Sequence, residues 1–275
     1  VVRIVIAFAM MFACAFTPPL LSQIPAVRSF ALAHSHPQGN VDDLVMTAFV
    51  LLLYGTATIL VLMLCYVLRR TLDRGPRVSL CLRLDRRALL WVVGMVLVAA
   101  AVNLAVTGIV HALGLAGGNE GIPDRPWWIM AVTIFSQAFL LQGIPEEIIW
   151  RGWLFSSLGE TRFAAVSSVL GFTVLHLLSQ VGQQNLLEHI TYLAMPCGFA
   201  VTALIVRTIS GSTWAAIGVH GGFQVANDML SDWLHLPHGS ITWILQGLLW
   251  AAVGLLILAF HRRRQRLAAL TGQTC

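Results

Sequence analysis

The sequence predicts an all-α protein, a polytopic transmembrane bundle of about eight helices. Of the 275 residues, 57% are hydrophobic and only 11% are charged, whereas ordinary soluble domains carry roughly 25% charged residues. The apolar residues come in blocks of about 18 to 25, the length that a helix needs to cross about 30 Å of hydrocarbon. Short connections rich in Gly, Pro and Arg separate these blocks, as in membrane proteins that cross the bilayer several times.

The first block, residues 4–16, follows Arg3 and runs into Pro18 and Pro19. It fits either a first membrane span or a cleaved signal peptide, which would leave seven spans. A small-residue stretch at residues 31–33 resembles a cleavage site, but it lies well beyond the usual distance from the apolar region. We therefore favour an uncleaved anchor.

Seven further blocks predict the remaining membrane helices, over residues 44–68, 89–115, 127–155, 163–178, 187–209, 213–229 and 241–260. The connection after the first of them contains seven arginines: Arg69, Arg70, Arg74, Arg77, Arg83, Arg86 and Arg87. Because positively charged connections stay in the cytoplasm, this connection fixes the orientation. Alternation then places Arg162, Arg207 and the arginine-rich tail inside, and it predicts that both termini are cytoplasmic.

The net charge of +5 comes from Arg alone, because the sequence contains no Lys. Most of these arginines border apolar blocks, a placement that orients helices, and no base-reading module accompanies them. We therefore expect the lipid bilayer as a partner and no nucleic acid. The five cysteines lack the C-x-x-C spacing of a metal or redox site.

Two carboxylates and a guanidinium interrupt the apolar helix at residues 142–155. Each charge near the bilayer centre costs roughly 2.5 to 3.5 kcal/mol, so such charges persist when they are paired or face a wet cavity. Glu147 and Arg151 stand four residues apart in the order that favours an ion pair on a helix. Glu146 points about 100° away from Glu147 and is left to face other helices, where it could act as a general base. Pro145 could kink the helix beside it.

Histidines interrupt two of the later spans. His176 follows Phe172 in one span, and His220 lies two spans later, with Gln224 and Asn227 on the same helix face. At 1.5 Å per residue, His176, Glu146 and His220 lie roughly 20, 14 to 18 and 10 Å from their cytoplasmic helix ends. We therefore expect these side chains to meet in one cavity.

These residues resemble a known pattern, Glu-Glu-x-x-x-Arg, Phe-x-x-x-His and His-x-x-x-Asn in that order on separate spans. The pattern is that of the CPBP intramembrane proteases, which comprise the type II CAAX prenyl endopeptidases and the bacteriocin-processing (Abi) proteins. The matching positions are Glu146, Glu147, Arg151, Phe172, His176 and His220. The last position departs from the pattern, because Gln224 stands where the family usually has Asn. Asn227, one turn further on, could take that role instead.

The resemblance implies a fold and a mechanism. Glu146 with His176 would activate a water molecule, while His220 and Gln224 or Asn227 would stabilise the oxyanion. Glu147, counted among the catalytic residues, would also form a structural ion pair with Arg151. The family has been described both as metalloproteases and as metal-free glutamate peptidases. His176, His220 and Glu146 could ligate zinc with an open position for water, although no H-E-x-x-H helix is present.

The apolar blocks, together with the extent of the resemblance, suggest how the chain is organised. We expect an N-terminal anchor or signal segment with an external loop, two flanking helices with a basic cytoplasmic loop, a CPBP-like catalytic core, and a last helix with a basic cytoplasmic tail. The corresponding ranges are residues 1–43, 44–126, 127–230 and 231–275.

The function predicted is an intramembrane endopeptidase of the bacterial cytoplasmic membrane. Its substrates would be proteins or peptides in or at the membrane, such as CAAX-like tails or leader peptides. Two alternatives stay open. A proton-coupled transporter could use the same buried acids and histidines as a relay, although no repeated halves are visible. A non-proteolytic scaffold or regulator of the same fold is the other alternative.

Overall fold

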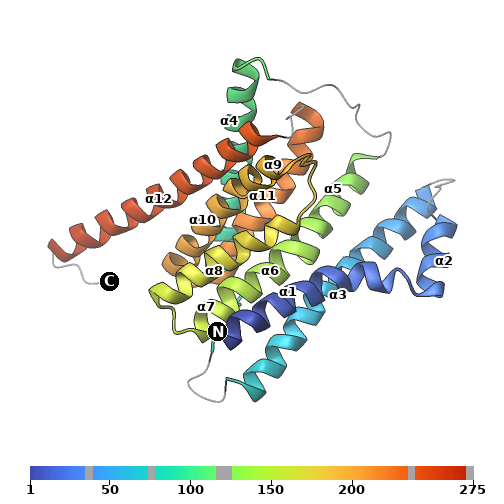
Figure 1. The fold of residues 1–275 in the computed structure, drawn as a ribbon, viewed down its shortest axis with the longest axis horizontal. Helices are drawn as coiled ribbons and strands as arrows, with labels where there is room; N and C mark the ends of the chain where they lie inside the picture. The colour runs from blue at the N-terminus through green and yellow to red at the C-terminus, as the bar shows by residue number, and fades with distance from the viewer. Residues whose placement is uncertain (35–39, 74–77, 116–125, 235–238, 271–275) are drawn as a thin grey trace.

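The computed structural model describes residues 1–34, 40–73, 78–115, 126–234 and 239–270 (Figure 1). Every regular element in these ranges is helical, and none of the described residues forms a strand. The predicted all-α class is therefore confirmed. Arg74 and Arg77 of the arginine-rich connection lie outside the described residues.

Four helices belong to the first half of the chain. They are α1 (Val2–Leu21), α2 (Pro25–His34), α3 (Asn40–Thr71) and α4 (Arg86–Ala112). An uninterrupted helical rod then covers residues 127–157. Its parts are α5 (Trp127–Phe135), the π-helical η1 (Ser136–Gly143), α6 (Ile144–Glu147), the π-helical η2 (Ile148–Leu154) and α7 (Phe155–Ser157).

The second half continues with six elements. They are α8 (Arg162–Leu175), the short 3₁₀ turn η3 (His176–Leu178), α9 (Leu186–Tyr192), α10 (Ala194–Ser210), α11 (Thr213–Leu234) and α12 (Ser240–Leu270). Of these elements, α8, α10 and α11 pack against the rod. Thr161 starts α8 as an N-cap, accepting a hydrogen bond from the backbone N–H of Ala164. Gly211 ends α10 in the left-handed conformation that glycine adopts without strain.

Six helical segments of the described chain are long and apolar enough to cross a bilayer, so the protein is an integral membrane protein. They cover residues 2–21, 41–71, 86–112, 127–157, 186–210 and 240–270. These are six of the eight predicted spans. The other two predicted spans are also helical, but the segment over residues 162–178 is shorter and α11 is not among the six.

Some boundaries differ from the predicted ones. Residues 25–34, which fall in the segment expected to hold an external loop, form α2, and α3 begins at Asn40. Asp42 and Asp43 therefore lie in the first turn of α3. Acidic side chains are favourable there because they face the positive end of the helix dipole. At the other end α12 continues to Leu270, beyond the predicted end of the span at residue 260, and its end projects from the bundle (Figure 1). Residues 255–270 contain neither Gly nor Pro, which explains why the helix does not stop.

Contacts between connections agree with the predicted alternation of the spans. Arg3 at the start of α1 forms an ion pair with Asp73 after α3. Arg207 near the end of α10 forms a 3.1 Å ion pair with Glu160, between α7 and α8, and its guanidinium also contacts the sulfur of Cys81. The connections that alternation assigns to one side of the membrane are thus joined to one another. That this side is the cytoplasm remains a prediction.

Glycines let α11 approach its neighbours closely. A Cβ added at Gly221 would lie 2.5 Å from the ring of Phe139 on η1, and one at Gly222 would lie 2.8 Å from the backbone of Val96 on α4. At both distances the added Cβ would overlap with its neighbour, and one of the two helices would have to move. Glycine fits at these positions because it has no Cβ. Small residues allow this close packing in membranes, where lipid supplies no hydrophobic drive between helices. His220, next to this pair of glycines, is therefore held against the central rod.

Candidate active site

The two glutamates lie where the helical geometry of the central rod changes. Glu146 and Glu147 end a single α-helical turn, α6, which is bordered by η1 on one side and η2 on the other. Pro145, inside this turn, has no backbone N–H to donate. Short π-helical segments within α-helices occur frequently at functional sites. The kink that Pro145 could introduce stays a prediction, and the structure adds a π-helical segment on each side of this turn.

Glu147 is the buried centre of a charged cluster. Its Oε1 atom accepts a hydrogen bond from Nη1 of Arg151 at 3.0 Å and lies 3.2 Å from Nδ1 of His220. The side chains of Glu147 and Arg151 are fully buried. One carboxylate therefore joins the rod to α11, a pairing of the kind that permits charges inside a membrane.

Arg151 ties this cluster to two more helices. Its Nη2 atom donates to the backbone carbonyl oxygen of Ala200 on α10 at 3.1 Å. Its guanidinium carbon lies 4.6 Å from the ring centroid of Phe172 on α8, within the range of a cation–π interaction. The guanidinium of Arg151 thus links the rod to both α8 and α10.

Phe172 also stands between the two histidines of the predicted site. Its ring centroid lies 4.5 Å from that of His176 and 5.6 Å from that of His220. Nδ1 of His176 lies 2.9 Å from the backbone carbonyl oxygen of Phe172, and a carbonyl only accepts. Nδ1 therefore carries the proton, and Nε2 of a neutral His176 is a free acceptor.

Glu146 keeps one carboxylate oxygen without a protein partner. Its Oε2 atom is buried and forms no hydrogen bond. Glu146 lies against a cavity of about 160 Å³. Because a buried polar atom usually finds a partner, this oxygen is suited to bind water or a substrate group.

The two candidate amides on α11 have different surroundings. Nε2 of Gln224 donates to Oε1 of Gln142 on η1 at 2.7 Å, one helical turn before Glu146. Asn227 instead accepts a hydrogen bond from Gln246 of α12 at 3.0 Å, and Gln246 also donates to Asn103 of α4 at 2.9 Å. Gln224 is thus the amide joined to the helix of the glutamates, and Asn227 belongs to a separate buried network.

Among the described residues, no group of three or more His, Cys, Asp and Glu side chains could hold a metal ion. Glu146, His176 and His220, named as possible zinc ligands, therefore do not form such a group. No step of the chemistry below involves a metal.

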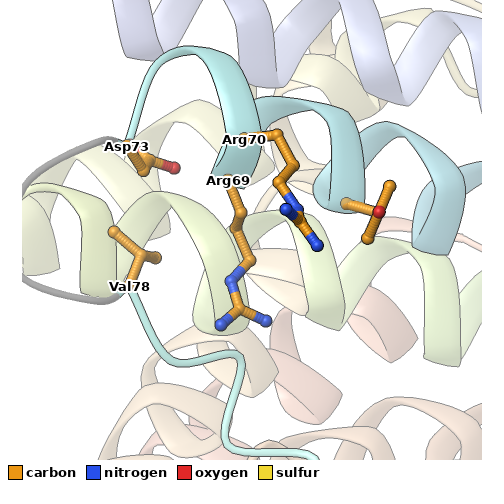
Figure 2. Close-up of a pocket in the computed structure, with 5 residues that line it drawn as sticks. Arg69, Arg70, Asp73 and Val78 are labelled. Atoms are coloured by element: carbon orange, nitrogen blue, oxygen red, sulfur yellow. The ribbon is translucent and has the colours of Figure 1, made fainter.

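A second pocket lies at the end of α3 and contains none of the predicted site residues (Figure 2). It is lined by Tyr66, Arg69, Arg70, Asp73 and Val78. Figure 2 shows the guanidinium groups of Arg69 and Arg70 extending to the same side. Asp73 accepts a hydrogen bond from the indole N–H of Trp153 at 2.9 Å, in addition to its ion pair with Arg3. Asp73 therefore fixes the start of α1 and the helix η2 to the same point.

Sequence reasoning missed two contributions to the site. Gln142 stands four residues before Glu146 and so shares its helix face, a spacing that could have revealed it. The other is α1, whose residues Met11, Cys14 and Ala15 line the cavity beside Glu146. Nothing in the composition of α1 distinguishes it from an ordinary anchor.

The segment that carries this geometry matches a known family. The model of the type II CAAX prenyl endopeptidase Rce1-like family matches residues 125–226. This range includes both glutamates, Arg151, both histidines and Gln224, and the match is consistent with the CPBP family. The family assignment made from the motifs is thus borne out over this segment, which is similar to the type II CAAX prenyl endopeptidases. No curated protein and no solved structure is similar enough to this chain to match it.

Proposed function

We propose that this protein is an intramembrane endopeptidase in which Glu146 activates a water molecule for attack on a peptide carbonyl. The observation that carries the proposal is the buried, unpartnered Oε2 atom of Glu146, the residue directly before the Glu147 that pairs with His220. A general base must reach the proton that it removes, directly or through one water. The free oxygen can accept that proton from a water molecule that binds to it.

His176 assists Glu146 in this proposal. With Nδ1 committed to the carbonyl oxygen of Phe172, the imidazole presents Nε2 as an acceptor. That atom would hold the second hydrogen of the attacking water and orient its lone pair. The aromatic ring of Phe172 keeps the imidazole in place.

His220 and Gln224 would stabilise the oxyanion. A protonated His220 donates from Nδ1 to Glu147 and has a second N–H at Nε2 to donate elsewhere. Gln224 has two amide hydrogens, and its hydrogen bond to Gln142 uses one of them. Donors fixed before the reaction need no reorganisation as charge develops, which makes them effective in a site with little water. Glu147 and Arg151 position His220 rather than touch the substrate.

The substrate would be a protein or peptide segment in or at the membrane, such as a CAAX-like tail or a leader peptide. The site is built on membrane helices, and the cavity beside Glu146 has a mainly apolar lining. A peptide bond can reach such a site only when its segment enters the bilayer or lies at its surface.

The test compares protein termini in cells that carry the natural chain, Glu146→Gln, or the control Glu188→Gln on α9. We expect a set of termini present with the natural chain and the control and lost with Glu146→Gln at equal expression. Identical termini in all three strains would overturn the peptidase proposal and would favour a scaffold or a proton relay.

A further inference from the structure

We infer that the cavity between α1 and the central rod is a pocket for one apolar substrate side chain, about the size of leucine or phenylalanine, whose size limit α1 sets. The inference rests on the proposed peptidase function and names the part of the substrate that the site selects. In this inference the substrate also contacts α1, which lies outside the segment that the family model matches.

The lining of the cavity is mostly apolar. From α1 it includes Met11, Cys14 and Ala15, and from the rod it includes Leu141, Gln142, Pro145 and Glu146. The polar exceptions, Gln142 and Glu146, are both parts of the proposed site. Gln142 already accepts a hydrogen bond from Gln224, so its carbonyl is satisfied. An apolar group that enters the cavity therefore meets mainly apolar walls.

The volume sets the size of the occupant. The cavity measures about 160 Å³, and an engineered apolar cavity of about 150 Å³ binds benzene. One branched or aromatic side chain fills such a space. A whole isoprenoid chain is several times larger than benzene and would have to lie elsewhere.

The position of Glu146 connects the pocket to the chemistry. The unpartnered Oε2 atom belongs to a residue that lines this cavity. A substrate residue whose side chain fills the pocket would bring its own backbone beside that carboxylate. The pocket thus selects the residue next to the bond that is cut.

The part of α1 that lines the cavity is held in place by contacts with the rest of the protein, and the cavity is partly open to the surface. Phe8 packs edge-on against Trp150 of η2 with ring centroids 5.5 Å apart, and Arg3 pairs with Asp73. Cys14 is 2% exposed, whereas Ala15 is exposed and also lines the cavity. A larger side chain at position 15 can therefore occupy the cavity without being forced into the packed core.

The first test measures side-chain preference. The reconstituted natural chain, Ala15→Phe and the control Ala9→Phe are given peptides that differ only in one residue, glycine, alanine, leucine or phenylalanine, at the cut site. Ala9 is exposed on the same helix and does not line the cavity. We expect Ala15→Phe to lower the preference for leucine over alanine by about 10-fold or more, the usual effect of a change in an apolar pocket. The control should keep the natural preference, and an unchanged preference in Ala15→Phe would overturn the inference.

The second test does not depend on catalysis. Glu146→Gln is prepared with Cys14, Cys65, Cys81, Cys197 and Cys275 changed to alanine and with Ala15→Cys added, so that one exposed thiol lines the cavity. We expect N-phenylmaleimide to modify this thiol, and a leucine-bearing peptide to slow the reaction several-fold while its glycine counterpart does not. Equal rates with both peptides would overturn the pocket. Protection of the thiol combined with no cleavage by the natural chain would overturn the peptidase and leave the pocket standing.

Discussion

His220 of α11 and Glu147 of α6 are joined through Nδ1 and Oε1, 3.2 Å apart, across two helices that the chain separates by 73 residues. The same oxygen accepts a hydrogen bond from Arg151, so one carboxylate fixes both a cation and an imidazole. This arrangement commits Nδ1 of His220 and leaves Nε2 for the substrate. Positioning of the proposed oxyanion donor thus depends on Glu147.

Replacement of Glu147 by glutamine should destabilise the fold strongly. Arg151 would keep its positive charge in a fully buried position without its carboxylate partner, and breaking a buried pair in this way costs about 3 to 5 kcal/mol. Unfolding in detergent measures the loss. The double variant Glu147→Gln, Arg151→Met should recover much of the stability but not the activity. A single variant as stable as the natural chain would contradict the pairing.

Replacement of His176 by phenylalanine should remove activity and preserve the fold. Phenylalanine keeps an aromatic ring against Phe172, where the ring centroids are now 4.5 Å apart, but it lacks Nε2. Loss of an assisting base lowers rates by about 10² to 10⁴-fold. Cleavage by the reconstituted protein gives the rate, and thermal unfolding checks the fold. His261→Phe, in the C-terminal part of α12, serves as the control, and equal rates in both variants would rule out the proposed role.

Replacement of Gln224 should lower mainly the rate of cleavage, whereas replacement of Asn227 should lower mainly the stability of the fold. Gln224→Leu removes the side chain that meets Gln142, and loss of one oxyanion donor costs about 10² to 10³ in rate. Asn227→Leu leaves Gln246 with one acceptor fewer and should cost about 1 to 3 kcal/mol of stability with a smaller effect on the rate. Parallel measurements of cleavage and unfolding test both. The opposite pattern would assign the oxyanion role to Asn227.

Gly221→Ala should displace His220 and reduce activity. The added Cβ would lie 2.5 Å from the Phe139 ring, so α11 must move away from η1. Phe139→Leu in the same chain makes room and should restore part of the activity. Rates of the single and double variants test this coupling, and activity of Gly221→Ala equal to that of the natural chain would show that α11 does not need this close contact.

Contacts between residues of one helix could be predicted from the sequence. Contacts between different helices could not, because they depend on how the helices pack. Glu147 and Arg151 lie on one helix, so their spacing predicts the ion pair that the structure contains. The contact of Glu147 with His220 depends on how closely α11 approaches the rod, which spacing along the chain does not reveal. Asn227 illustrates the same limit, because it shares the helix face of Gln224 yet bonds to Gln246 on α12.

The most direct measurement of the central claim is cleavage of a membrane-inserted peptide by the purified chain in vesicles, with Glu146→Gln compared in the same lipid. Glutamine keeps the shape of the side chain but cannot accept a proton as a base. We predict that the natural chain cuts the peptide and that Glu146→Gln, equally folded, loses at least about 10²-fold in rate. Cleavage by Glu146→Gln at the rate of the natural chain would contradict the account.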